Sequence, residues 1–422
     1  MNLIEQNQLM VIHFHPFTME LLKEKRGTNM KQLSKGKSVF IIFSIILVSI
    51  NLRPAITSVG PILSTIREAL QVSSTHMSLL TSIPVFCMGL FAPLAVSIQK
   101  KYGYRWSVTI LIALIGLATA ARIVFSNYGA LIVTSFLAGF AIAIISPIIN
   151  AYIKEMFPTK MEPVIGVYSF AMGFGATLSA GFTAIIYKIF DGNWSLALGI
   201  WGVLAIIAMI SWFTVVTDSG VSSSISSQTV ERRNPWKNKV AWSILLFFGF
   251  QTSLFFSLTT WLTSVALEQG MALLTAGSVL TLMTIVQLAG NLLIPSFINR
   301  YPNRIIWLHS LIMVGMVGSA VFFINEVWAI WVSAVVFGFV LSGLFPIGLM
   351  LPLDEAKNKA EANEWSSMVL SGGFMMSAIV PLIIGIVYDV TGTHYVTKWI
   401  IVILFAFMSL SIMRMQRQKK SV

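Results

Sequence analysis

The chain has 422 residues, of which 56% are apolar and only 10% are charged, and its mean hydropathy is +0.82. Globular domains usually carry about 25% charged residues, so this composition excludes a water-soluble enzyme and predicts an all-α integral membrane protein. The net charge of +12 is then attributed to membrane topology rather than to nucleic-acid binding, because cationic residues collect in cytoplasmic loops.

The first 37 residues are polar and rich in lysine, and we expect them to form a cytoplasmic tail. No apolar run there precedes a small-residue cleavage site, so a removable signal peptide is not expected. Two interpretations stay open: a disordered tail that starts at Met1, or a translation start at Met30 that leaves a short basic leader.

Twelve apolar segments follow, each close to the roughly 20 residues that a helix needs to cross a bilayer core. The predicted spans are 38–66, 76–99, 105–126, 128–153, 163–190, 193–217, 240–266, 271–299, 303–324, 326–353, 365–388 and 393–414. They fall into two six-helix halves, 38–217 and 240–414. A Ser-rich, charged cytoplasmic linker at 218–239 separates the halves, and a short cytoplasmic tail covers 415–422.

The distribution of lysine and arginine predicts the orientation in a bacterial inner membrane. With both termini in the cytoplasm, the outer side keeps only Arg67, Lys188 and Lys398. The halves also resemble each other: KYGYR at 101–105 after the second span is echoed by RYPNR at 300–304 after the eighth. This layout indicates a transporter whose substrate site lies between the halves near the membrane midplane.

Two arginines fall inside predicted spans. Arg53 lies about 15 residues into the first span and Arg122 about 17 residues into the third, roughly 22 and 25 Å deep at 1.5 Å per residue. Pro54 should kink the first helix beside Arg53. All 16 acidic residues fall in loops or at span ends, so we expect the substrate to supply the negative charge. The alternative is that both side chains snorkel to the interface or cap backbone carbonyls.

The absence of an intramembrane carboxylate also bears on energy coupling, since proton-driven carriers commonly use one. A uniporter, an anion exchanger and cotransport with a protonated substrate all stay open. Gln251 and Trp261 in the seventh span indicate a small polar or planar ligand, although Gln251 is equally explained by hydrogen bonding between helices. Asn51, Tyr168 and Gln287 are weaker candidates.

No catalytic, phosphate-binding or metal-ligand constellation is present in the sequence, so we expect no enzyme activity, no cofactor and no metal. The single cysteine, Cys87, cannot form an intrachain disulfide. The expected partners are a small-molecule substrate and the lipid bilayer, without nucleic acid, and the layout is compatible with a monomer.

Several stretches resemble a known family. NLRPAITSVGP at 51–61 is similar to the first-helix motif of the cyanate permease and nitroimidazole transporter family of the major facilitator superfamily. Further agreement comes from LLTSIPV at 79–85, GLFAPLA at 89–95, Arg122, Phe157-Pro158, GFQT at 249–252, Trp261-Leu262, Phe345-Pro346 and PLIIG at 381–385.

The resemblance implies the twelve-helix major facilitator fold and a secondary carrier for a small, anionic or nitrogen-rich solute, with Arg53 as a functional position. It also implies a gating loop between the second and third helices, here with Lys101, Gly103 and Arg105. The chain departs from the superfamily pattern at Lys100, where an acidic residue usually stands, which puts the usual acid–base contact in doubt. The fifth span also has no Gly-Pro pair of the drug/proton antiporter type.

Two other functions are compatible with a chain of this kind. A multidrug or metabolite exporter is favoured by the 12% aromatic content and the 21 methionines, but two intramembrane arginines argue against a site for lipophilic cations. A membrane sensor that has lost transport would normally need an extra soluble domain. Neither the tail nor the linker is long enough to form one.

Overall fold

The structure is a computed structural model, and it describes residues 35–217, 234–300 and 303–420. Most of the predicted tail at 1–37 and of the linker at 218–239 lies outside the described residues. Contacts divide the chain into two units, Met1–Ile41 and Ile42–Val422. The described part of the first unit is the opening of one helix, and the account below concerns the second unit.

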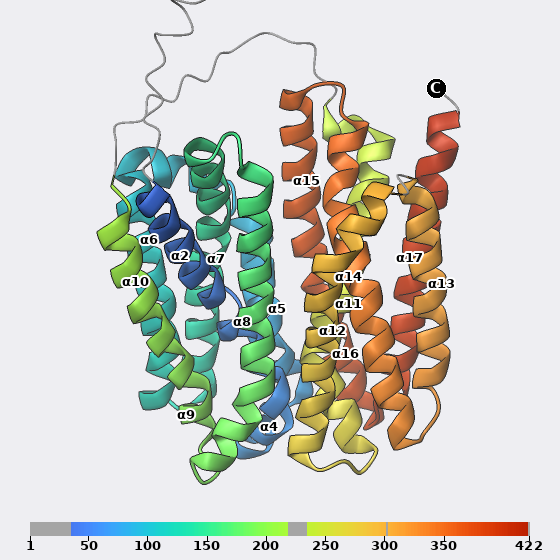
Figure 1. Cartoon of the computed structure of the whole chain (residues 1–422). Coiled ribbons are helices and arrows are strands. Elements are labelled where there is room, and N and C mark those ends of the chain that lie inside the picture. The colour runs from blue at the N-terminus through green and yellow to red at the C-terminus, as the bar shows by residue number, and fades with distance from the viewer. Residues whose placement is uncertain (1–34, 218–233, 301–302, 421–422) are drawn as a thin grey trace, which may run out of the picture. The chain divides into compact units, whose positions relative to one another are not determined.

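All described secondary structure is helical (Figure 1). The first half contains α2 (Lys35–Asn51), α3 (Pro54–Thr57), η1 (Gly60–Ile62), α4 (Leu63–Leu70), α5 (Ser74–Leu90), α6 (Leu94–Val124), α7 (Tyr128–Met156), α8 (Met161–Ile189), α9 (Trp194–Gly199), η2 (Ile200–Gly202) and α10 (Val203–Val215). The second half contains η3 (Pro235–Lys237), α11 (Lys239–Glu268), α12 (Leu273–Arg300), α13 (Arg304–Phe322), α14 (Val327–Glu355), α15 (Lys359–Ser377), α16 (Ile379–Thr391) and α17 (Tyr395–Lys420).

The helices agree with the predicted spans to within a few residues. Eleven helical segments of the described chain are long and apolar enough to cross a membrane. The other expected span, 76–99, corresponds to α5, which has 17 residues, and the first turns of α6. Gly103 then separates two helical parts of α6 with φ 73° and ψ 177°, a backbone conformation open essentially to glycine alone. The second span therefore ends in the loop that was expected to be the gating loop.

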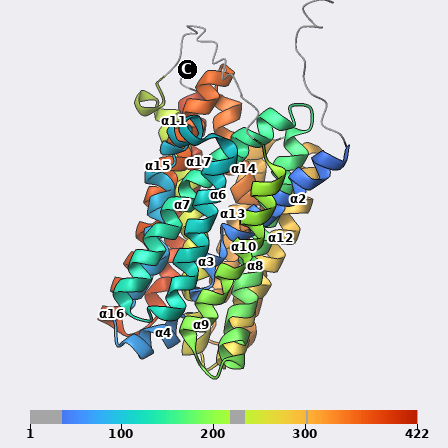
Figure 2. The same cartoon turned by 90° about the vertical axis from the view of Figure 1, so that its left-hand side faces the viewer.

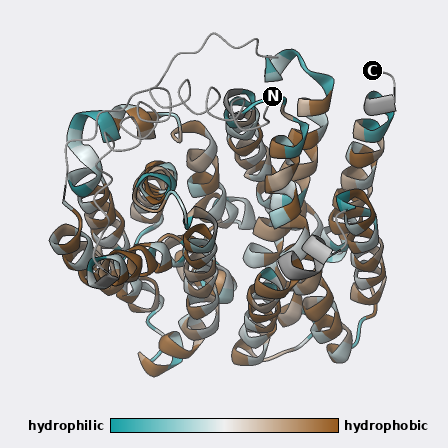
Figure 3. Ribbon diagram, turned by 45° about the horizontal axis from the view of Figure 1, so that its top comes forward, coloured by the Kyte–Doolittle hydropathy of each residue, from teal (hydrophilic) through white to brown (hydrophobic). Residues whose placement is uncertain are grey.

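The outer surface of the helices is apolar. Leu117, Val124 and Val390 are each at least 70% exposed, and Figure 3 shows hydrophobic residues along the helices with hydrophilic ones toward their ends. An apolar surface this extensive cannot face water and is the surface expected to contact lipid.

The first span is broken in its middle, which confirms the kink predicted at Pro54. Proline has no N–H, so the carbonyl of Ile50 loses its helical donor. On one side of the break Gly175 of α8 packs so closely that a Cβ there would overlap the Ile50 carbonyl. On the other side Gly60 packs in the same way on the Thr259 carbonyl of α11. The broken helix is thus held between one helix from each half.

The two halves meet along two pairs of helices. Helix α8 packs against α12, and α5 packs against α15 and α16; Figure 2 shows α8 and α12 side by side. Each of these contacts joins a helix of the first half to the second half. A cavity between the halves is therefore lined by residues far apart in sequence.

Candidate functional site

A cavity of about 620 Å³ lies between the two halves. The first half lines it with Arg53 and with one face of α8 between Pro163 and Ala176; the second half lines it with residues of α11, α12, α14 and α15. The lining residues come from the first half of α8, from the middle of α11 and from the later part of α12 and α14. They therefore lie toward the end of the unit where α10 stops and α11 begins, the side of the predicted linker.

Arg53 is a buried cation without a counter-charge from the residues that the structure describes. Its side chain is 8% exposed, its Nη1 has no hydrogen-bond partner, and no ion pair is present at this residue in the described chain. Its guanidinium carbon lies 5.8 and 5.7 Å from the ring centroids of Phe255 and Phe256. Cation–π contacts provide part of the stabilisation that a desolvated guanidinium needs, but they leave its N–H donors available to a ligand.

Arg122 is equally buried, at 1% exposed, but it does not line the cavity. Its Nε donates to the hydroxyl of Thr134 at 3.2 Å, and its Nη2 donates to the hydroxyl of Ser135 at 3.2 Å. Its Nη1 donates to the carbonyl of Ala55 at 3.1 Å, within the broken first helix. Each guanidinium nitrogen of Arg122 therefore has a protein partner, and one of the three is a backbone carbonyl.

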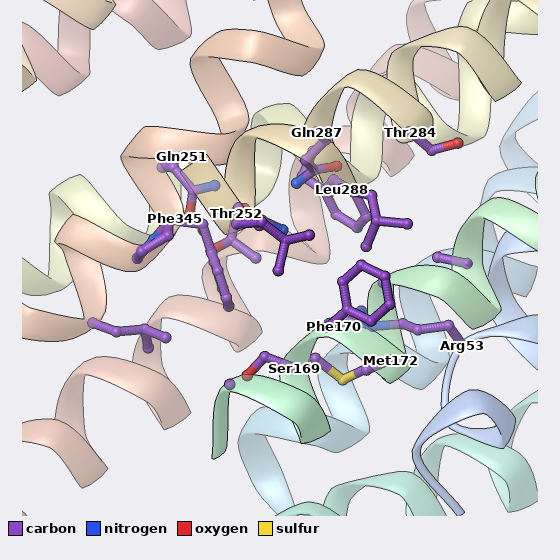
Figure 4. Close-up of a pocket in the computed structure, with 18 of the residues that line it drawn as sticks. Arg53, Ser169, Phe170, Met172, Gln251, Thr252, Thr284, Gln287, Leu288 and Phe345 are labelled. Carbon is purple, nitrogen blue, oxygen red and sulfur yellow. Dashed lines mark hydrogen bonds between the residues drawn. The ribbon is translucent and has the colours of Figure 1, made fainter. Parts of the chain in front are cut away.

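The second half contributes amide side chains to the cavity. Gln251 of α11 is 1% exposed, and its Oε1 accepts from the Thr252 hydroxyl at 3.2 Å, while its Nε2 has no partner among the described residues. Gln287 and Asn291 of α12 line the same space, and Asn291 Oδ1 is likewise unpaired. Figure 4 shows Gln251 and Gln287 pointing into the space from one side, with Phe170 and Arg53 on the other.

The other predicted site residues are placed elsewhere. The Asn51 amide donates to the carbonyls of Leu47 and Leu204 at 2.8 and 3.3 Å, which ties α2 to α10. Tyr168 is buried and is not among the residues that line the cavity. The Trp261 indole donates to the Pro381 carbonyl at 3.0 Å. Of the six predicted substrate residues, the structure therefore brings Arg53 and Gln251 together in the cavity.

Sequence reasoning missed Thr284 and Asn291, although Gln287 between them was a weak candidate. The three residues follow i, i+3, i+7 spacing on α12, so they share one helix face. A search for polar stripes in the eighth span would have identified them.

The residues of the predicted gating loop make contacts at the end of the unit where α10 stops and α11 begins. Lys101 lies with its Nζ 5.1 Å from the ring centroid of Tyr102. The Arg105 Nε donates to the Phe213 carbonyl at 2.8 Å, and the guanidinium stacks on the Phe213 ring at 3.9 Å. These contacts fix the start of the third span against α10.

The opposite end is closed by a carboxylate that crosses between the halves. Asp389 of α16 accepts hydrogen bonds from the backbone N–H groups of Ser74 and Thr75 at 2.7 and 2.8 Å, and from the Thr75 hydroxyl at 2.5 Å. These groups form the first turn of α5, where a negative charge is favoured by unpaired N–H groups and the helix dipole. Arg67 reinforces this contact by donating to the Ser74 hydroxyl at 2.9 Å and lying over the Tyr388 ring.

A second carboxylate at this end, Glu268, accepts from the backbone N–H of His394 at 2.8 Å and from the Thr393 hydroxyl at 2.6 Å. The His394 ring lies 4.3 Å from that of Tyr388 and 5.4 Å from that of Trp261, centroid to centroid. The pKa of His394 is lowered to about 4, mainly by burial; the charge of Glu268 opposes this shift and the charge of Arg67 adds to it. At neutral pH this histidine is therefore uncharged.

Comparison with known proteins gives the family. The model of the Major Facilitator Superfamily matches residues 39–363. The chain is 29% identical over 365 residues to the cyanate transport protein CynX of Escherichia coli (strain K12), covering 85% of this chain and 92% of the relative. It is 26% identical over 382 residues to the 2-nitroimidazole transporter of the same organism, covering 90% and 95%. It is 28% identical over 377 residues to the uncharacterized transporter YycB of Bacillus subtilis (strain 168), covering 88% and 92%.

Solved structures support the same fold. A bacterial homolog of the human lysosomal transporter Spinster, in an inward-facing and occupied conformation, superposes with a TM-score of 0.74 at 14% identity, covering 92% of this chain and 98% of that one. The nucleoside transporter NupG gives a TM-score of 0.69 at 14% identity, covering 91% and 99%. The predicted two-half, twelve-span fold is thus confirmed, as is the prediction of a transporter rather than an enzyme. The chain belongs to the major facilitator superfamily, and its similarity to a cyanate transport protein and a 2-nitroimidazole transporter agrees with the resemblance seen in the sequence.

Proposed function

We propose that this protein carries a small, anionic or nitrogen-rich solute of the cyanate-like or nitroimidazole-like class, by alternating access between its two halves. The observation that carries the proposal is Arg53, a buried guanidinium on the cavity wall without a hydrogen-bond acceptor or carboxylate from the described chain at its Nη1. A desolvated cation is costly unless it is paired. An anionic substrate supplies that missing partner.

The placement of the cavity supports alternating access. The cavity lies toward the predicted linker, while Asp389 joins the halves at the other end. The sequence-based orientation puts the linker in the cytoplasm, so the cavity belongs to the cytoplasmic side in this conformation. To test the orientation, Cys87→Ser should be combined with Ser126→Cys or with Lys237→Cys, both exposed positions. An impermeant thiol reagent should label position 126 in intact cells and position 237 only in inside-out vesicles; the reverse pattern contradicts the orientation.

The charge of the substrate is tested by uptake into proteoliposomes of labelled small anions, neutral nitrogen heterocycles and lipophilic cations. Arg53→Lys keeps the charge but loses the planar fork that holds an anion with two hydrogen bonds. Anion uptake should therefore need a higher concentration in Arg53→Lys, whereas Lys188→Gln, a charge change outside the cavity, should leave it unchanged. Uptake of lipophilic cations, with no binding of any anion, would instead establish the multidrug alternative.

A further inference from the structure

The two halves present different chemistry to the cavity. The first half provides the positive charge of Arg53, and the second half provides the amides of Gln251, Gln287 and Asn291. Figure 4 shows the labelled amides on the side of the space opposite Arg53. A ligand that satisfies both halves therefore needs an acidic group at one end and an uncharged polar edge at the other.

Unpaired atoms specify that polar edge. Gln251 is 1% exposed and its Oε1 is already used by Thr252, so its free Nε2 is a donor without an acceptor. The unpaired atom of Asn291 is an oxygen, an acceptor without a donor. Buried polar groups of this kind are normally satisfied. Among its described residues that line the cavity, the second half thus lacks one acceptor and one N–H donor, which are the two groups of a cyclic amide edge.

The walls and the size of the cavity favour a planar ring. Phe170 from the first half and Phe255, Phe345 and Phe374 from the second half line the space, and aromatic faces pack well against flat ligands. The cavity volume of about 620 Å³ falls in the range of roughly 300–1,000 Å³ found for sites of drug-sized molecules. A three-atom anion bound at Arg53 would fill only a small part of this space.

We infer that the substrate is a planar cyclic amide or imide bearing an ionised acid group, with the acid at Arg53 and the N–H/C=O edge at Gln251 and Asn291. This inference rests on the proposed function, because it keeps the anion at Arg53, and it adds the recognition of the opposite edge. Gln251 donates to the ring carbonyl, and Asn291 accepts from the ring N–H. Each half then binds one end of the same molecule, so binding favours the conformation in which both halves reach the substrate.

The test uses three probes on the purified full chain, with binding measured by thermal stabilisation and by competition for uptake in proteoliposomes. Orotate carries both groups, benzoate carries the acid on a ring of the same size without the amide edge, and uracil carries the edge without the acid. Orotate should bind at least about tenfold more tightly than either, because benzoate leaves the buried amides unpaired and uracil leaves Arg53 unpaired.

Variants assign the preference to individual residues. Gln251→Met keeps the side-chain length and should reduce the ratio of orotate to benzoate affinity to near one, with benzoate affinity unchanged. Asn291→Leu should do the same, and it serves as an independent variant if Gln251→Met does not fold. Gln269→Met, at the far end of the same helix and outside the cavity, is the matched control and should keep the preference.

The outcomes distinguish a failure of the inference about the amide edge from a failure of the proposed function. Equal binding of orotate and benzoate to the parent protein, or an unchanged preference in both amide variants, would overturn the inference while the anion carrier stands. Binding of uracil with no binding of either acid would overturn the anion site at Arg53, the observation on which the proposed function rests.

Discussion

Arg53 and Arg122 are two buried arginines of the same half, and they differ in the groups that surround them. In the structure, each guanidinium nitrogen of Arg122 donates to a protein oxygen, on Ala55, Thr134 or Ser135. Arg53 has aromatic rings as neighbours and an Nη1 without an acceptor, and it lines the cavity. A buried charge that the protein satisfies maintains structure, whereas one that it leaves unsatisfied is available for a ligand.

The same contrast separates two regions of the molecule. At the closed end, the carboxylates of Asp389 and Glu268 are satisfied by backbone N–H and hydroxyl groups. In the cavity, Arg53, Gln251 and Asn291 each keep an unpaired atom. Removing a polar group from the cavity should therefore impair substrate binding. Removing a satisfied polar group elsewhere should instead reduce the stability of the fold or the closure of that end.

The largest effect is expected for Arg53→Gln. Anion uptake should fall to background, because the charge that offsets the substrate is gone. Without substrate, the variant should melt at the same temperature as the parent or higher, since an unpaired intramembrane cation costs at least about 2.5–3.5 kcal/mol. Uptake and melting temperature in detergent, measured with and without substrate, check both statements. Normal uptake by Arg53→Gln would mean that the two arginines do not differ in function.

Arg122→Gln should show the opposite pattern. A glutamine cannot replace three donors, so the Ala55 carbonyl or one of the two hydroxyls loses its partner, at a cost of about 1–3 kcal/mol for each unsatisfied buried group. The melting temperature should fall by several degrees, while the substrate affinity of the remaining folded protein stays close to that of the parent. A stable Arg122→Gln protein that no longer binds anion would assign Arg122 to the site after all.

A smaller effect is expected for Asp389→Asn, which removes the charge from the first turn of α5. Capping and dipole interactions of this kind are worth about 0.5–2 kcal/mol, so the closed end should open several-fold more often. The rate at which an impermeant reagent labels Ser78→Cys, a buried position beside Gly385 of α16, should rise accordingly in a Cys87→Ser background. Asp191→Asn, a carboxylate at the same end within the first half, is the control. Equal labelling in both variants would show that Asp389 does not hold the halves together.

The smallest effect is the pH dependence expected from His394. The folded state keeps this ring uncharged down to about pH 4, while the unfolded chain takes up a proton below its ordinary pKa of 6.5. The contribution of His394 to the free energy of unfolding is therefore fully present above pH 6.5 and is lost as the pH drops toward 4. Between pH 7 and 5.5 the free energy of unfolding should fall by about 1 kcal/mol. His394→Asn should flatten that part of the profile of melting temperature against pH. An unchanged slope would show that other groups cause it.

The linear pattern of the chain determined the spans and the break in the first helix. Hydropathy decides these features locally, because about 20 consecutive apolar residues must cross the bilayer as a helix and a proline without an N–H interrupts it wherever it stands. Counting residues from the start of each apolar span also gave the depth of Arg53 and showed that no carboxylate lies in the interior of the predicted spans.

Only the tertiary structure decided which buried polar groups are satisfied. Helical periodicity gives the face on which Arg122 or Trp261 lies but not the helix that this face meets, and their partners, Ala55 and Pro381, are 67 and 120 residues away. The hydrogen bonds of Asp389 span about 315 residues. The unpaired atoms of Gln251 and Asn291 appear only once the halves are packed. Which buried groups find no partner is decided by the packing of helices that are far apart in sequence, and the sequence of one chain does not carry that information residue by residue.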